Sequence, residues 1–251
     1  MSETGGTTPG MQRLGVQFLL TNDDGIDATG LSTLAPIAAQ LGSVLVVAPD
    51  RHLSGCGHQV TVERPLRLQR RKEARFALDG TPADCVRIGL HLQEQKIDWV
   101  LSGINHGGNL GIDTYMSGTV AAAREAAISG IPAIAFSQYR NGSGDIDWIQ
   151  ASEMVHRVLD LLMQRPLPPG LFWNVNLPDL RNGSGQEPRL VDCPVDPNPL
   201  SFGFRMDDDQ FSYEGVYQDR IRHPGSDIDC CFGGDIAISQ LGIELKTVPE
   251  S

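Results

Sequence analysis

Leu19-Leu20-Thr21-Asn22-Asp23-Asp24-Gly25 is the stretch that decides the fold, because an apolar run ends there at two adjacent acids. The mostly apolar residues 16–20 predict a buried strand. In an open parallel sheet, ligands bind outside the carboxyl ends of the strands, where Asp23 and Asp24 would lie. Their carboxylates repel each other unless a cation neutralises them, and a divalent metal with oxygen ligands is the natural cation. A solvated turn explains the same residues, and on this stretch alone it is slightly favoured.

Strands alternate with helices outward from this stretch. Apolar residues at helical spacing follow Gly25 and end before Gly42, a predicted C-cap, and residues 43–48 form a second apolar strand. A strand, a helix and a strand within this length predict a parallel βαβ unit with a right-handed crossover. Later segments continue the pattern, with expected strands at 98–101, 131–136, 172–178 and 235–241 and expected helices at 120–129 and 148–162. The sequence therefore predicts an α/β fold with a mostly parallel sheet.

The segment between the second strand and residue 84 departs from this pattern. Residues 51–57 form a predicted loop on the same edge as the paired acids, where Ser54 could offer a hydroxyl. Short alternating runs at 60–62, 66–68 and 75–78 predict a hairpin that leaves the parallel core. Thr81-Pro82-Ala83-Asp84 then predicts a helix start, with threonine as the N-cap and aspartate completing a capping box.

Composition limits the classes of protein to which the chain can belong. Its 251 residues, 40% of them hydrophobic, suit one large α/β domain. Residues 1–13 lack the features of a signal peptide and are expected to be a disordered lead-in, and no apolar run is long enough to span a membrane. The cysteines contain no CxxC pair, which indicates reduced thiols in a cytoplasmic protein. The net charge of −11 argues against binding to a nucleic-acid duplex, and an anionic substrate would need a metal or backbone amides.

A second informative stretch, residues 102–113, is rich in glycine and includes Asn105 and Asn109. It leads to Ser117-Gly118-Thr119, which opens a helix and could bind an anion with its amides and hydroxyls. The stretch contains neither a Walker A sequence nor GxGxxG. An ordinary turn with a capping serine explains the same residues.

Several segments together resemble the survival protein E (SurE) family of metal-dependent nucleotide phosphatases. They occur in the order of that family at residues 21–26, 46–51, 80–86, 102–113, 117–123 and 174–178. The resemblance implies a Rossmann-like catalytic core over residues 14–180. It further implies that residues 181–251 supply a C-terminal arm and a returning strand within the same domain. In this family the arm is used to form homodimers or homotetramers.

The resemblance also implies the site residues and the reaction. The positions that match the family's metal ligands are Asp23, Asp24, Ser54 and Asn105, which would hold one Mg²⁺ or Mn²⁺ per subunit. The positions that match its phosphate contacts are Asn109, Ser117, Gly118 and Thr119. Catalytic roles are expected for Asp23, Asn109 and Ser117. The expected activity is that of a 5′- or 3′-nucleotidase, an acid-type phosphomonoesterase that acts on nucleoside monophosphates. Met116 and residues 195–230 depart from the family pattern.

The residues leave parts of the mechanism open. Either Asp23 or a hydroxide on the metal could serve as the general base, and His106 is interpreted as a loop residue rather than a catalytic acid. A nucleotide sensor without turnover would use the same loops. A haloacid-dehalogenase-type phosphatase would need Asp-x-Asp after its first strand, whereas Asp23 and Asp24 are adjacent. The three aspartates at residues 207–209 are interpreted as a solvated turn, in preference to a metal site.

Overall fold

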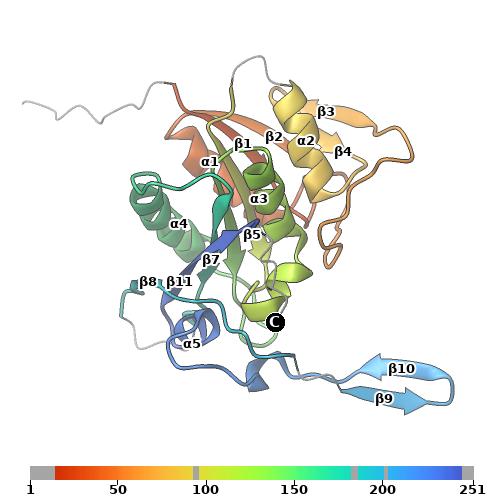
Figure 1. Ribbon diagram of the computed structural model, residues 1–251, viewed down its shortest axis with the longest axis vertical. Coiled ribbons are helices and arrows are strands. Elements are labelled where there is room, and N and C mark those ends of the chain that lie inside the picture. The colour runs from red at the N-terminus through yellow and green to blue at the C-terminus, as the bar shows by residue number, and fades with distance from the viewer. Residues whose placement is uncertain (1–14, 93–95, 182–185, 201–202, 245–251) are drawn as a thin grey trace, which may run out of the picture.

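The structure is a computed structural model, and it describes residues 15–92, 96–181, 186–200 and 203–244. The expected lead-in at 1–13 lies outside these ranges. A nine-stranded sheet in the order β3-β4-β2-β1-β5-β6-β7-β11-β8 forms the centre of the molecule (Figure 1). Its strands are β1 (Gln17–Thr21), β2 (Ser43–Pro49), β3 (Leu68–Lys72), β4 (Arg75–Leu78), β5 (Trp99–His106), β6 (Ala133–Gln138), β7 (Leu171–Leu177), β8 (Leu190–Asp192) and β11 (Ile236–Gly242).

Most of this sheet is parallel. The strands from β4 through β2, β1, β5 and β6 to β7 all run in one direction. Only β3, which is antiparallel to β4, and the β11–β8 pair, whose β11 is antiparallel to β7, reverse it. The central strands are buried on both faces, which is why they read as apolar runs in the sequence. The predicted α/β class with a mostly parallel sheet is confirmed.

Helices cover both faces of the sheet, as Figure 1 shows. On one face, α1 and α4 pack over a core that includes Phe18, Leu34 and Val155, and on the other, α2 and α3 pack over Leu19, Val86 and Val120. The helices are α1 (Thr29–Ala39), α2 (Pro82–Leu92), α3 (Gly118–Ile128), α4 (Trp148–Leu162) and α5 (Asp227–Phe232), with short 3-10 helices at Gly111–Tyr115 and Tyr217–Asp219. No described helix is long and apolar enough to cross a membrane.

Two local expectations differ from the structure. Helix α1 is capped at Gln40 rather than at Gly42, and Gly42 instead allows close contact with the first strand, since a Cβ there would lie 2.2 Å from Val16 O. The predicted hairpin exists as β3 and β4, but β4 pairs with β2 and so extends the main sheet. Residues 60–62 form no strand. The capping box at α2 is confirmed: Asp84 N donates to Thr81 Oγ1, and Thr81 N donates to Asp84 Oδ2.

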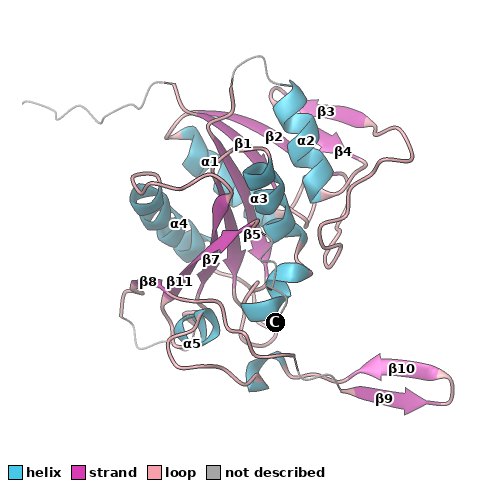
Figure 2. Cartoon of the chain, viewed as in Figure 1, coloured by secondary structure: helices cyan, strands magenta, loops and turns pink. Residues whose placement is uncertain are grey.

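The C-terminal region contributes to the sheet and also leaves it. Strands β8 and β11 extend the sheet beyond β7, and α5 packs beside them around Ile228 and Cys231. Strands β9 (Phe204–Asp207) and β10 (Gln210–Tyr213) form a separate antiparallel hairpin that projects from the body (Figure 2). We call residues 204–213 the arm. The acidic residues 207–209 make its turn, with Asp208 at φ 53°, as the solvated-turn interpretation predicts.

Candidate active site

The polar residues of the candidate site gather at the carboxyl ends of the parallel strands. The loops after β1, β2 and β5 lead to this edge, and so does the N-terminus of α3. We call this edge the rim. At the end of β1, Asn22 makes the turn: its Nδ2 donates to Gly25 O over 2.9 Å, and its Oδ1 accepts from Gly25 N over 3.2 Å. The predicted turn is therefore present, but Asn22 alone supplies its side-chain bonds and the two acids that follow are left for other partners.

Asp23 is buried and held by the first turn of α3. Thr119 donates to it twice, through its hydroxyl over 2.6 Å and through its backbone N–H over 3.1 Å. Burial, with a smaller contribution from the neighbouring Asp24, raises the pKa of Asp23 to about 6, while the Thr119 bonds oppose the rise. Gly118 allows this close approach, because a Cβ on it would lie 2.8 Å from Asp23 Cβ.

Asp24 faces a cleft of about 710 Å³, which Ser54, His52 and His106 also line. Its carboxylate accepts from His106 N over 3.0 Å, and its other oxygen lies 3.4 Å from His52 Nδ1. Ser54 is exposed on the loop after β2. The structure thus brings Asp24 and Ser54 to one cleft, and it places His106 at the end of β5 rather than within a loop.

Asn109 sits in a network of buried amides. Its N–H donates to Asn176 Oδ1 over 2.7 Å, and its carbonyl accepts from Asn174 Nδ2 and Asn176 Nδ2. Its own Nδ2 donates to Ser137 Oγ over 2.8 Å. Asn105, which is level with Ser137 in the sheet, donates through Nδ2 to Gly107 O, so its Oδ1 faces away from that carbonyl. Backbone and side chain of Asn109 are therefore both fixed by neighbouring strands.

The N-terminus of α3 provides donors for an anion. Ser117 is the N-cap, and its Oγ accepts from Val120 N over 3.1 Å, so its hydroxyl proton remains free to be donated. Gly118 N makes no hydrogen bond to the described part of the chain. Thr119 differs from the expectation, because in this structure its hydroxyl and amide both serve Asp23. Its expected contact with phosphate stays a prediction.

The expected metal ligands form a donor set of two carboxylates and two neutral oxygens. Such a set suits a hard cation such as Mg²⁺ or Mn²⁺, which prefers oxygen ligands. The raised pKa of Asp23 points the same way, since burial, with a smaller contribution from Asp24, makes its charge costly unless a cation is held beside it. Within the described ranges no three His, Cys, Asp or Glu side chains come together to bind a metal, so a nitrogen- or sulfur-rich centre is not formed there.

The loop that carries Ser54 is tied to the helices by a buried carboxylate. Glu125 of α3 lies 2.8 Å from His58 Nε2 and accepts from Arg87 Nε over 2.6 Å. Cys56, on the same loop, has a pKa raised by burial and by the charge of Asp23, which keeps its thiol protonated. The Glu125 contacts join the loop to α2 and α3, and the Cys56 thiol supplies no thiolate nucleophile.

Sequence reasoning missed several residues that shape this site. Asn174 and Asn176 lie in a segment that matches the family pattern, but the sequence indicates no role for them, and it does not single out Ser137 or His52. One signal could have revealed the asparagines: two amides two residues apart in an apolar strand share a face, and buried amides need partners. No comparable signal marks Ser137 or His52, because their partners lie far away in the sequence.

Comparison with known proteins agrees with this geometry. The sequence profile of the family described as survival protein SurE matches residues 18–193. The chain is 53% identical over 226 residues to a Nostoc sp. protein that its name assigns provisionally to the 5′-nucleotidases, covering 90% of this chain and 99% of that protein. It is 47% identical over 166 residues to 5′-nucleotidase SurE of Geobacter metallireducens, covering 66% of each.

Among solved structures, the crystal structure of SurE protein from Aquifex aeolicus matches with a TM-score of 0.78 and 33% identity, covering 92% of this chain and 94% of that one. The likeness therefore extends beyond the rim to the sheet, the helices and most of the C-terminal region. With most of its length matched by the family profile and by close relatives, this chain belongs to the survival protein SurE family.

Proposed function

We propose that this chain is a metal-dependent phosphomonoesterase that hydrolyses nucleoside monophosphates at the 5′ position, the 3′ position or both. The names of its relatives, such as 5′-nucleotidase SurE of Geobacter metallireducens, support the 5′ activity. The observation that carries the proposal is the pair of hydrogen bonds from Thr119 to Asp23. These two bonds link Asp23, one of the paired acids that attract a cation, to the N-terminus of α3. A helix N-terminus attracts an anion.

The cation side of the site would consist of Asp23, Asp24, Ser54 and Asn105, holding one Mg²⁺ or Mn²⁺ in each subunit. When bound, such an ion supplies positive charge to a phosphoryl oxygen, which a chain of net charge −11 needs in order to attract a dianion. The protein's own part is to orient the ligands. Thr119 fixes the Asp23 carboxylate, and His106 N fixes that of Asp24.

The anion side would consist of the Ser117 hydroxyl, the Gly118 amide and the Asn109 side chain. Donors that are fixed before the reaction stabilise the charge that spreads over the phosphoryl oxygens in the transition state. Asn109 is fixed by Ser137 and Asn176, and Ser117 by its capping bond to Val120. We assign the catalytic roles to Asp23, Asn109 and Ser117.

Two other mechanisms fit these residues less well. A haloacid-dehalogenase-type enzyme needs Asp-x-Asp after its first strand, whereas Asp23 and Asp24 are adjacent. A cysteine nucleophile is disfavoured because the pKa of Cys56 is raised. Water is therefore the acceptor that we propose. A nucleotide sensor would use the same donors, and turnover separates it from an enzyme.

The decisive experiment measures phosphate release from adenosine 5′-monophosphate and adenosine 3′-monophosphate. We expect release from at least one of them in Mn²⁺ or Mg²⁺, loss of release in EDTA, and recovery when the metal is restored. Nucleotide binding without release would identify a sensor. Release that EDTA leaves unchanged would contradict the metal site.

We also propose that the chain forms a homodimer or homotetramer through its C-terminal region. The arm supports this, because one of its faces is apolar: Phe204 lies opposite Tyr213 and Met206 lies opposite Phe211 across the hairpin. All four of these side chains are more than half exposed. A hairpin of this kind buries its apolar face only against another surface.

A further inference from the structure

The cleft beside Asp24 and Ser54 extends well beyond the expected position of the metal. Its volume of about 710 Å³ lies within the range of roughly 300 to 1,000 Å³ that is typical of small-molecule sites. A phosphate group with a metal ion fills only a small part of such a volume. The cleft therefore has room for another portion of the substrate, and its lining indicates which portion.

One wall of the cleft is aromatic. The rings of His106 and Trp148 both line it, with centroids 6.4 Å apart and planes inclined by 43°. At this spacing the two rings are in contact with each other. They therefore form one continuous aromatic surface rather than two facing rings with room for a ligand between them. Ile146 adds an apolar side chain to the same cleft. A flat aromatic group could stack against this wall.

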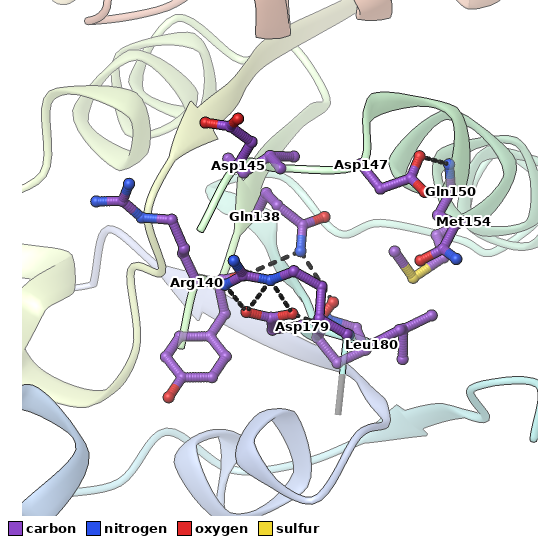
Figure 3. Close-up of a pocket in the computed structure, with 12 residues that line it drawn as sticks. Gln138, Arg140, Asp145, Asp147, Gln150, Met154, Asp179 and Leu180 are labelled. Carbon is purple, nitrogen blue, oxygen red and sulfur yellow. Dashed lines mark hydrogen bonds and ion pairs between the residues drawn. The ribbon is translucent and has the colours of Figure 1, made fainter. Parts of the chain in front are cut away.

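Trp148 is held in place by the helix that it begins. It is the first residue of α4, and the N-cap Asp147 accepts from Ile149 N over 3.0 Å and from Gln150 N over 3.1 Å. Figure 3 shows this cap at the first turn of the helix, with Asp145 on the preceding loop. Gly30 of α1 makes room for the indole, since a Cβ there would lie 3.2 Å from Trp148 Cη2.

The loop before Trp148 is fixed at its other end. Asp179 accepts from Asn141 N over 2.7 Å, and Arg181 donates to Asn141 O over 2.9 Å. Arg181 also pairs with Asp179, which Figure 3 shows beside Gln138 and Arg140. Because both ends of the loop are anchored, a ligand that stacks on Trp148 does not have to order the loop first.

The charges of the cleft select against further phosphate groups. Asp24 and Asp145 contribute carboxylates, and none of the described residues that line the cleft is a lysine or an arginine. A second or third phosphate would meet these carboxylates without a fixed cationic side chain. A neutral ring with amino or ring N–H groups would instead find carboxylate acceptors.

We propose that this cleft binds the base of a nucleoside monophosphate, stacked on the Trp148–His106 wall with Asp145 placed to accept a hydrogen bond from the base. The assignment rests on the proposed nucleotidase function, whose phosphate donors adjoin Asp23 at the start of α3, whereas the cleft adjoins Asp24. It makes Trp148 a specificity-determining residue and predicts preference for monophosphates that carry a base over sugar phosphates that lack one.

The first experiment compares adenosine 5′-monophosphate with ribose 5-phosphate, which lacks the base, in wild type and in Trp148→Ala. Base stacking on an aromatic side chain leads us to expect a roughly 5- to 100-fold rise in KM for the nucleotide. We expect kcat/KM for ribose 5-phosphate to change by less than about twofold, which also verifies folding. Trp148→Phe, which keeps a stacking ring, should recover most of the affinity.

Each other outcome has a distinct meaning. If wild type releases phosphate neither from these compounds nor from adenosine 3′-monophosphate, the proposed function fails. If wild type hydrolyses the nucleotide and Trp148→Ala affects both substrates equally, or neither, the base site is overturned while the function stands.

A second experiment does not depend on turnover. The chain has three tryptophans, and only Trp148 lines this cleft, since Trp99 begins β5 and Trp173 lies in β7. We expect adenosine, which carries no phosphate, to quench tryptophan fluorescence in wild type and in the control Trp99→Phe, but not in Trp148→Phe. Quenching that persists in Trp148→Phe would contradict the proposed position of the base.

Discussion

The rim buries polar side chains, whereas the arm exposes apolar ones. Eight polar residues of the rim are less than a tenth exposed: Asn22, Asp23, Asn109, Ser117, Thr119, Ser137, Asn174 and Asn176. In the arm, by contrast, Phe204, Met206, Phe211 and Tyr213 are 57% to 66% exposed. Each region departs from the usual distribution of residues, in opposite directions.

The contrast shows where each region finds its partners. Most polar groups of the rim have partners within the chain, mainly through hydrogen bonds between distant segments such as Asn109 with Asn176 and Asp23 with Thr119. Asn174 Oδ1 is the exception, because it has no partner among the described residues. The apolar face of the arm has no such internal partner within the described residues. The segment that follows the arm is anchored, however: Arg220 and Tyr217 both bind Asp113, in the loop between Asn109 and Ser117. The arm is thereby tethered to the segment between Asn109 and Ser117.

The largest expected effect comes from Asp23→Asn, which tests whether the buried acid at the rim serves function rather than stability. We expect turnover to fall by at least about a hundredfold, because a metal ligand and a charge in the site are lost. Asp27→Asn, an exposed acid four residues away, is the matched control and should retain activity. Normal turnover in Asp23→Asn would remove this residue from the mechanism.

Asp23→Asn should lose activity but gain folding stability. Since the pKa of Asp23 is raised from 3.8 to about 6, the native state binds this proton more tightly than the unfolded state, and stability falls as pH rises through this range. In EDTA above pH 6, Asp23→Asn should therefore be the more stable protein, by up to about 3 kcal/mol less the weakened Thr119 bonds. Thermal melts in EDTA should show this advantage vanishing near pH 4. An advantage that is independent of pH would contradict the raised pKa.

Ser117→Ala has the next largest expected effect. It separates two roles of the Ser117 hydroxyl, that of a helix cap and that of a phosphate donor. As a cap alone, Ser117 should contribute about 1 kcal/mol of stability and nothing to turnover. As a phosphate donor, its loss should lower kcat by roughly 10²- to 10³-fold and weaken inhibition by vanadate. Ser226→Ala, which removes the N-cap of α5 away from the rim, is the control for stability loss. If Ser117→Ala keeps a near-normal kcat per folded molecule, it is only a cap.

The sequence predicts the rim better than it predicts the bonds that hold the rim together. Apolar runs locate β1, β7 and α4 closely, because this signal acts within a few neighbouring residues. They miss the end of β5, which continues to His106 beyond the expected strand at 98–101. The same local logic places Asp23 and Ser117 at the same edge of the sheet. The hydrogen bond from Thr119 to Asp23 joins residues 96 positions apart, and no local pattern encodes it.

The arm was harder to anticipate for a physical reason. Its alternation at Phe204, Met206, Phe211 and Tyr213 is that of a half-buried hairpin, but its apolar face meets no surface within the described residues. Helix α5 was missed because it has only six residues, too few to show helical spacing. Both segments depend on contacts rather than on local preference.

Met206→Asp combined with Phe211→Asp should have the smallest effect on chemistry, and it tests the arm directly. These two residues lie opposite each other on the apolar face, so the double variant places two carboxylates where a second subunit would pack. We expect light scattering to show a dimer or tetramer for wild type and a monomer for the variant, with turnover per subunit within about twofold.

The control for this experiment is Ser212→Asp, which adds a charge to the opposite face of the same hairpin. It should leave the assembly intact, since Ser212 pairs with Arg205 there. A wild-type protein that is monomeric at micromolar concentration, or a double variant that keeps the full mass, would contradict association through the arm. Loss of turnover together with loss of mass would instead show that the rim depends on the neighbouring subunit, and the anchor at Asp113 would be the path by which it does so.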